Sequence, residues 1–142
     1  DWDRRYTLMR YHTAAHVLSA VFLEESGALI TGNQLSTDKA RFDFSIESFD
    51  REKINEFVNI ANRIIEEGHP VKIYYLPRNE VEKRGLTKLA KGLPPGLDIL
   101  RIVEIEGVDI QADGGTHVKN TREIGRIEPI KYENKGKNNR RI

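Results

Sequence analysis

The sequence contains no cysteine, and this absence removes two kinds of structure from consideration. Without thiols the chain can form neither a disulfide framework nor a zinc site with thiolate ligands. Apolar runs of about 18 residues, which would cross a membrane, are also missing, and no signal-peptide pattern opens the chain. We therefore expect a soluble, cytoplasmic protein.

An excess of charge of one sign is missing as well. The 23 basic and 22 acidic residues give a formal net charge of +1, so no strong overall field attracts nucleic acid. The 142 residues, of which 38% are hydrophobic, suffice for one domain with a sizeable core. The basic residues at the end of the chain predict a flexible tail over 133–142, with contact to phosphate as the alternative.

Hydrophobic spacing predicts an α+β fold in which helices pack on a mostly antiparallel sheet. Long helices are expected from residue 3 to about 26 and from about 51 to 67, because apolar residues recur there at helical spacing and a glycine follows each segment. Alternating patterns and turn residues predict the other elements. These are strands over 29–34, 41–46, 71–76, 99–106, 108–112 and 126–132, the last an edge strand, and a helical turn or two over 79–84.

Two of the four histidines, His12 and His16, lie four residues apart in the first predicted helix. Residues at this spacing share one helix face, so both imidazoles can point at one ion. They border the apolar stripe of the helix, which favours a site set partly inside the domain. Two polar helix positions that face solvent or have a satisfied hydrogen bond remain the alternative.

A second motif, Asp113-Gly-Gly-Thr-His117, directly follows an apolar stretch. Its two glycines permit close approach of the backbone to a ligand, while Asp113 and His117 can both reach a metal. A glycine turn whose aspartate bonds its own backbone is the alternative. The two motifs together offer three imidazoles and one carboxylate, the donor set of a catalytic zinc site that leaves one position open.

Three motifs in the same order resemble the alanyl-tRNA synthetase editing domain and its free-standing relatives, the AlaX-type trans-editing proteins. These motifs are Arg10-Tyr-His-Thr-Ala-Ala-His-Val-Leu, Arg41-Phe-Asp-Phe-Ser45, and Gly114-Gly-Thr-His-Val118 followed by Thr121-Arg-Glu-Ile-Gly125. The resemblance covers residues 1–132, which we take as the editing domain. It implies a fold of the threonyl/alanyl-tRNA synthetase second additional domain type. Larger members carry a further glycine-rich domain before this one, which the present chain is expected to lack.

The resemblance also implies an activity. Members of this family hydrolyse the ester of Ser-tRNA(Ala) or Gly-tRNA(Ala), with tRNA(Ala) as the partner. Such editing is needed because an apolar pocket cannot strongly reject an analogue that merely adds a hydroxyl. Carried over to this sequence, the family's zinc ligands are His12, His16 and His117, with one Zn²⁺ per chain.

The sequence departs from the family at Asp113, where the family has a cysteine. A carboxylate can bind zinc, so we expect Asp113 to be a direct or water-bridged ligand, with weak zinc binding as the alternative. His12, His16 and Thr116 are our candidate catalytic residues. The bound zinc would either activate a water or orient the substrate, and the sequence does not separate these routes.

Thr31 and Gln34, in the strand after the first helix, are candidates for binding the amino-acid part of the substrate. They are equally well explained as ordinary polar residues of a strand or turn. Two other functions stay open at this point. One is deacylation of another mischarged tRNA, as in threonyl-type editing, and the other is a catalytically inactive tRNA-binding module.

Overall fold

The computed structural model describes residues 2–28, 30–36, 38–45, 51–84, 98–130, 133–134 and 140–141. Its helices are α1 (Trp2–Ser26), α2 (Arg51–Glu67), α3 (Arg78–Arg84) and the 3-10 helix η1 (Thr121–Ile124). Its strands are β1 (Ile30–Leu35), β2 (Ala40–Phe44), β3 (Val71–Pro77), β4 (Ile99–Ile105), β5 (Asp109–Ala112), β6 (Glu133–Asn134) and β7 (Arg140–Arg141). The predicted α+β class is confirmed, although η1 was not expected.

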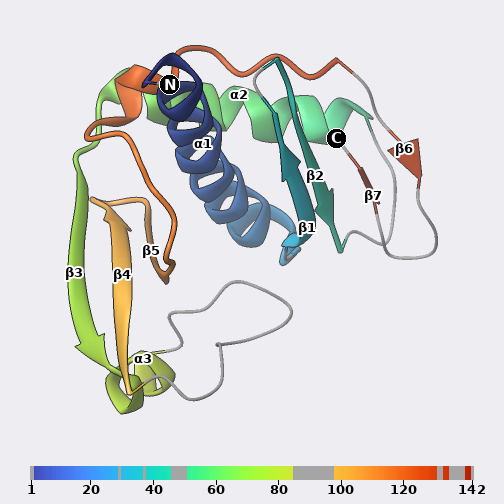
Figure 1. The fold of residues 1–142 in the computed structure, drawn as a ribbon. Helices are drawn as coiled ribbons and strands as arrows, with labels where there is room; N and C mark the ends of the chain where they lie inside the picture. The colour runs from blue at the N-terminus through green and yellow to red at the C-terminus, as the bar shows by residue number, and fades with distance from the viewer. Residues whose placement is uncertain are drawn as a thin grey trace.

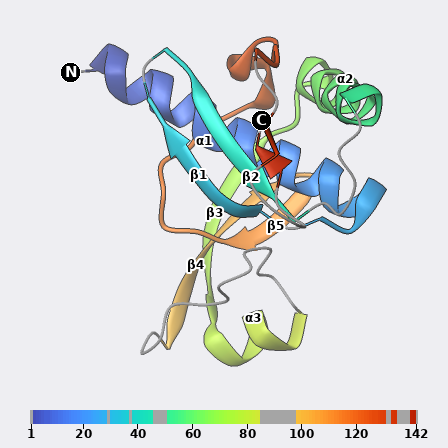
Figure 2. The ribbon, with the colours of Figure 1, turned by 90° about the vertical axis from the view of Figure 1, so that its right-hand side faces the viewer.

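The strands form two antiparallel sheets rather than one. One sheet has the order β1-β2-β7-β6 and the other β3-β4-β5. Helix α1 crosses the middle of the molecule between the two sheets, and α2 packs beside it (Figures 1 and 2). The two long helices therefore join the sheets into one body.

The central part of α1 is buried on all sides, from Thr13 to Ser19. The sequence predicted one apolar stripe bordered by His12 and His16, which would leave the opposite face of the helix in solvent. The flanking sheets and α2 instead cover the helix all round, which explains why small residues such as Ala14 and Ala15 stand there. Gly27, at φ +74°, then ends the helix and donates its N–H to the carbonyl of Leu23.

Aromatic packing connects α1 with the four-stranded sheet and α2. The Phe22 ring stacks on Phe44 of β2 with 4.1 Å between centroids, and meets the edge of Phe57 of α2 at 5.1 Å. Phe22 and Phe44 are fully buried. This contact fixes the helix that carries His12 and His16 relative to the hairpin.

The strand predicted over 126–132 is wrong for residues 126–130, which form no regular element. The main chain of Ile127 bonds a side chain instead of a neighbouring strand. Its N–H donates to Asn62 Oδ1 at 2.7 Å, and its carbonyl accepts from Asn62 Nδ2 at 3.0 Å. Because Pro129 has no N–H, it also could not have donated to a strand ladder.

Four residues of the predicted basic tail lie in strands, since β7 pairs with both β2 and β6. The division of the chain at residue 132 stays a prediction. Among the described residues, none of the helices has both the length and the apolar character that are needed to cross a bilayer.

Candidate metal centre

Two segments bring the candidate ligands together. Helix α1 carries His12 and His16 one turn apart, and the loop between β5 and η1 carries Asp113 and His117. One potential ligand atom from each of these four residues lies within 4.8 Å of the others. The structure thus assembles the four residues that the sequence nominated, while their role as ligands stays a prediction.

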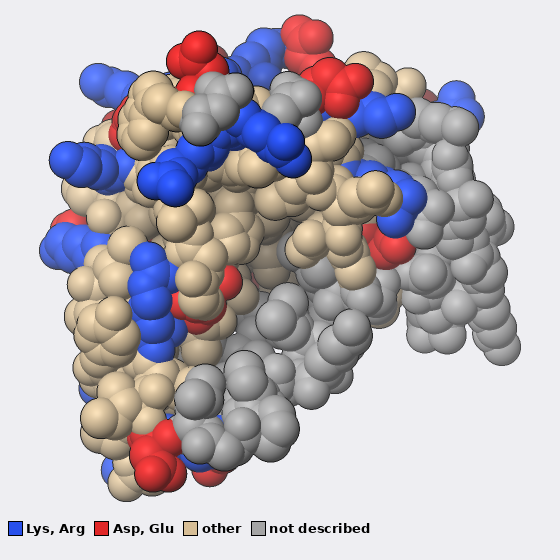
Figure 3. All heavy atoms as spheres, in the orientation of Figure 1, with Lys and Arg blue, Asp and Glu red and all other residues tan. Residues whose placement is uncertain are grey.

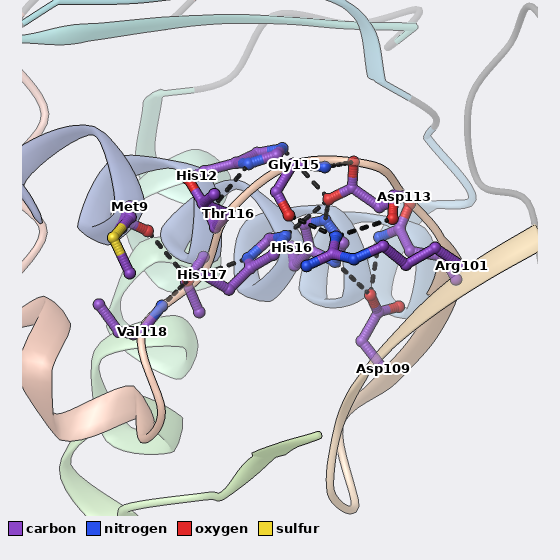
Figure 4. Close-up of polar contacts among 12 residues, drawn as sticks. Met9, His12, His16, Arg101, Asp109, Asp113, Gly115, Thr116, His117 and Val118 are labelled. Atoms are coloured by element: carbon purple, nitrogen blue, oxygen red, sulfur yellow. Dashed lines mark hydrogen bonds and ion pairs between the residues drawn. The ribbon is translucent and has the colours of Figure 1, made fainter. Parts of the chain in front are cut away.

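The three imidazoles converge on a single oxygen atom. Asp113 Oδ2 lies 3.2 Å from Nε2 of His12, 2.8 Å from Nε2 of His16 and 2.6 Å from Nε2 of His117. The His12 and His117 rings stack at 4.4 Å between centroids, and His16 is edge-on to both (Figure 4). All three rings therefore present the same nitrogen to the centre.

The other ring nitrogen of His12 and of His16 faces an oxygen outside the centre. His12 Nδ1 lies 3.3 Å from the carbonyl oxygen of Thr116, and His16 Nδ1 lies 3.3 Å from Oδ2 of buried Asp109. A carbonyl and a carboxylate only accept hydrogen bonds, so each contact favours a proton on Nδ1. A neutral ring with its proton there has a bare lone pair on Nε2, facing Asp113.

His117 is held in the same sense by Thr13. The hydroxyl of Thr13 donates to the Met9 carbonyl at 2.9 Å and accepts from the Val118 N–H at 3.1 Å. It lies 3.0 Å from His117 Nδ1 and has no second proton to give, so His117 donates to it. Nε2 of a neutral His117 then points its lone pair at Asp113.

A positive charge resolves this arrangement. Lone pairs of His12 and His117 directed at an ionised carboxylate repel it unless a proton or a cation lies between them. Three imidazole nitrogens and one carboxylate oxygen are a donor set that zinc accepts. Fixing the outer nitrogen of each ligating histidine is also the usual way in which proteins orient metal ligands. The residues therefore fit a metal ion such as zinc.

The electrostatics of the cluster agree with neutral His12 and His117. Burial lowers the pKa of His117 to about 4 and also lowers the pKa of His12. Burial alone would lower the pKa of His16 too, but the carboxylates of Asp109 and Asp113 raise it above its ordinary value. Burial opposes ionisation of Asp113, yet its short contacts with His117 and His16 hold its pKa well below its ordinary value, which requires a proton or another positive charge between these atoms.

Asp109 and Gln111 support the cluster from β5, and the sequence analysis did not nominate them. Gln111 Nε2 donates to Asp109 Oδ2 at 2.7 Å, and both side chains are buried. Together with Asp113 they alternate along the chain, so all three face α1 from one side of the sheet. A signal existed in the sequence: polar residues at positions 109, 111 and 113 interrupt an apolar strand in strict alternation.

Arg101 and Gly115 set the position of the loop. Nη1 of Arg101 donates to the carbonyl of Asp113 at 3.1 Å and to that of Gly115 (Figure 4). Gly115 donates its N–H to Asp113 Oδ1 at 3.1 Å, which leaves Oδ2 for the histidines. A Cβ at Gly115 would overlap the His12 ring, whereas one at Gly114 would meet nothing within 4 Å. Only the second glycine is needed for close approach.

The cluster opens to solvent on one side. The side chains of His12 and Asp113 are 26% and 19% exposed, while those of His16 and His117 are 6% and 0% exposed. A substrate would therefore arrive over His12 and Asp113. Figure 3, drawn from the same side as Figure 1, shows a hollow between the β3-β4-β5 sheet and the β1-β2 hairpin, with Lys and Arg side chains along its upper rim.

A cavity of about 470 Å³ lies elsewhere, and none of the four cluster residues lines it. Its walls include Ala14, Leu18 and Phe22 of α1 and Phe42 and Phe44 of β2, which belong to the hydrophobic core. The cavity lies against the four-stranded sheet, away from the cluster of three histidines and Asp113. The cluster is therefore the better candidate for a functional site.

The remaining nominated residues stand apart from the centre. Thr116 is exposed, and its contact with His12 is made by its carbonyl. Gln34 is exposed on β1 of the four-stranded sheet, where it pairs with Arg41 of β2. Thr31 also belongs to β1, but its side chain lies outside the described residues. Their catalytic and substrate-binding roles stay predictions.

Comparison with known proteins gives consistent matches along the whole chain. The chain is 55% identical, over all of its length, to an alanyl-tRNA editing protein AlaX-M from Methanosarcina acetivorans, and 50% identical to an AlaX-M from Saccharolobus solfataricus. An alanine–tRNA ligase from Methanococcus maripaludis is 43% identical over 94% of the chain. The family described as "Threonyl and Alanyl tRNA synthetase second additional domain" matches residues 100–142.

This chain is similar over its whole length to alanyl-tRNA editing proteins. The resemblance predicted from the three motifs is thereby confirmed, as is the α+β fold class. The chain spans 59% and 60% of the length of these two AlaX-M relatives, and it corresponds to 15% of the alanine–tRNA ligase. It therefore matches a segment that occurs both in AlaX-M editing proteins and within a much longer alanine–tRNA ligase.

The two glycines of the loop provide a matched pair of variants. We expect Gly115→Ala to weaken zinc binding strongly, because the added methyl displaces the His12 ring from the cluster. Gly114→Ala should bind zinc like the native protein, since a Cβ there meets open space. Competition of each variant with a chromophoric zinc chelator measures this difference. Equal affinities would show that the loop carries no such constraint.

Replacement of Asp109 tests the support behind His16. We expect Asp109→Asn to weaken zinc binding by about 10- to 100-fold, because a neutral amide accepts from His16 Nδ1–H more weakly than a carboxylate and can present its NH2 group instead. Glu106→Gln, at an exposed carboxylate just before β5, is the control and should leave affinity unchanged. If Asp109→Asn bound zinc as tightly as the native protein and kept its thermal stability, Asp109 would not be the residue that orients His16.

Proposed function

We propose that this chain hydrolyses the ester bond of mischarged tRNA(Ala) in trans, with Ser-tRNA(Ala) and Gly-tRNA(Ala) as substrates. The ligands would be His12, His16, His117 and Asp113, holding one zinc ion. The observation that carries the proposal is the convergence of three Nε2 atoms on one carboxylate oxygen, with every outer ring nitrogen directed at an oxygen.

The names of the relatives supply the substrate class. The matched AlaX-M proteins are described as alanyl-tRNA editing proteins, and the ligase charges tRNA with alanine. Serine and glycine are the amino acids whose size lets them enter an alanine site, so a second, hydrolytic site is needed against them. We infer that the activity belongs in the cytoplasm, where tRNA is charged and used.

Two of the four residues would hold the ion from the buried side, and the other two lie on the side that is open to the substrate. His16 and His117 are buried and would hold the ion from below, while Asp109 and Thr13 keep their rings oriented. When bound, a zinc ion would supply Lewis acidity toward the ester carbonyl or a water of lowered pKa. His12 and Asp113 lie on the open side, where the ester would arrive. Thr116 is exposed in the same loop as Asp113, and it stays our candidate for contacting the reacting group.

A second candidate function comes from the matched family, whose description names threonyl as well as alanyl synthetases. Deacylation of a tRNA of the threonyl type would use the same donor set. The identities of 50–56% with AlaX-M proteins favour the alanyl reading. A tRNA-binding module without catalysis would need no ordered ligand cluster, which makes it the weaker alternative.

Deacylation assays with matched histidine variants test the proposal. We expect the native chain to hydrolyse Ser-tRNA(Ala) or Gly-tRNA(Ala) and to contain about one zinc per chain by metal analysis. His12→Ala should lose more than about 100-fold in activity, because it removes a ligand from the open side. His69→Ala is the control, since His69 lies outside the cluster and contacts the carbonyl of Glu106.

The outcomes separate the alternatives. Hydrolysis of a threonyl-type mischarged tRNA alone would transfer the assignment to the second candidate. Tight tRNA binding without hydrolysis and without zinc would identify an inactive module. Normal deacylation by His12→Ala would rule out a mechanism that depends on this cluster.

The role of Asp113 can be tested by changing the ligand atom. With Co²⁺ in place of zinc, Asp113→Cys should develop a thiolate-to-cobalt charge-transfer absorption that the native protein lacks, because Asp113 Oδ2 lies at the centre of the cluster. Ser19→Cys, at a buried polar position of α1, is the control and should not develop the band. No such band in Asp113→Cys would show that residue 113 does not ligate the ion directly.

A further inference from the structure

Exposed apolar side chains gather on one face of the three-stranded sheet. Tyr75 and Ile99 are 65% exposed and Ile73 is 46% exposed, and they are three of the five large hydrophobic residues that stand exposed in the described part of the chain. The register pairs Tyr75 with Arg101 and Ile73 with Val103, and residues directly opposite each other lie on one face. Ile99 precedes Arg101 by two positions and so shares that face.

This face is continuous with the metal centre. Arg101, the partner of Tyr75, donates to the carbonyls of Asp113 and Gly115 in the loop of the cluster. The Asp113 N–H in turn donates to the Arg101 carbonyl at 3.0 Å, which extends the pairing of β4 by one residue. Figure 4 shows Arg101 reaching from β4 toward the cluster. Tyr75 therefore lies one strand farther out than a residue that touches the site.

The opposite face of the same sheet is covered by α3, whereas the face that carries Tyr75 is buried only at its other end, where Val103, Ile105, Asp109 and Gln111 lie. On the covered face, Tyr74, Leu76, Leu100 and Ile102 pack on Val81 of α3. Since β3 is the outer strand of the order β3-β4-β5, Tyr75 also stands at a sheet edge. Contiguous exposed apolar side chains beside a polar site indicate a surface for binding.

We propose that Tyr75, with Ile73 and Ile99 beside it, forms a stacking platform for the unpaired 3′ end of the RNA whose ester reaches the metal centre. This proposal rests on the proposed function. An RNA that carries an ester at its 3′ end would have to pass this face to place that ester over His12 and Asp113. Unpaired bases stack on exposed aromatic rings, and Arg101 supplies a positive charge beside the path of the phosphates. The platform would thus hold nucleotides before the terminal one and leave the ester free to enter the cluster.

Binding of an unacylated RNA tests the platform without requiring hydrolysis. The probe is a fluorescein-labelled single-stranded RNA of four nucleotides that ends in CCA, titrated with the protein as purified. We expect Tyr75→Ala to weaken binding by about 5- to 100-fold, the range of one lost base–aromatic stack. Tyr75→Trp should restore binding, because an indole offers a larger stacking surface.

A control on the same strand isolates stacking from charge and stability. Lys72→Ala removes an exposed cation whose side chain points to the opposite face of β3, and it should bind the RNA like the native chain. Ile99→Ser serves as a second test of the platform that leaves Tyr75 in place. Because these side chains are exposed, we expect all variants to melt near the temperature of the native protein.

Each outcome decides between readings. Native affinity of Tyr75→Ala for the RNA overturns the platform, as does a change from dimer to monomer in Tyr75→Ala, which would identify this face as a contact between two copies of the chain. RNA binding that depends on Tyr75 in a protein that deacylates no tRNA would refute the proposed function and retain the platform. A raised KM for mischarged tRNA in Tyr75→Ala, with kcat unchanged, would support both.

Discussion

The contact of one carboxylate oxygen with three imidazole nitrogens is the interaction on which the surrounding side chains and the loop depend. Asp113 Oδ2 can face His12, His16 and His117 together only where positive charge offsets the lone pairs. The surrounding contacts hold these four side chains in position. Each outer nitrogen is directed at an oxygen, Arg101 fixes the loop, and a glycine stands where any Cβ would overlap the His12 ring. The cluster is thus a product of its supports as much as of its four side chains.

The position of α1 links this chemistry to the fold. Its histidines face β5 and the loop, while other sides of the same helix pack on α2 and on Phe44 of β2. A buried helix in a close-packed interior cannot shift without disturbing its neighbours. The second sheet therefore contributes to the site without providing a ligand, because it fixes the helix that carries two of them.

Much of this could be read from the sequence, for reasons that are local. The helix over Trp2–Ser26 and most strands follow from spacing and glycine stops, and the His12/His16 pair follows from helical periodicity. The segment 126–130 could not be read in this way, since its main chain is satisfied by Asn62, a side chain more than 60 positions away. Long-range partners of this kind leave no periodic trace.

The supports of the site were missed for a related reason. Asp109 and Gln111 alternate with apolar residues, but only the pairing of β4 with β5 and the position of α1 show that they face His16. Thr13 lies within the histidine motif, yet its bond to His117 joins positions 104 apart. The exposure of Tyr75 likewise depends on which face of the sheet α3 covers. Tertiary arrangement decides each of these roles.

The distance along the chain between the two halves of the cluster has a consequence for folding. His16 and Asp113 meet across 97 positions, so whatever binds them together closes a ring that includes most of the chain. Closing such a ring restricts the unfolded chain far more than the folded one, by the same entropic argument that applies to a cross-link. A ligand of this centre would accordingly contribute its binding free energy to the stability of the whole domain. Binding of that ligand would then act as a reversible cross-link between α1 and the loop that follows β5.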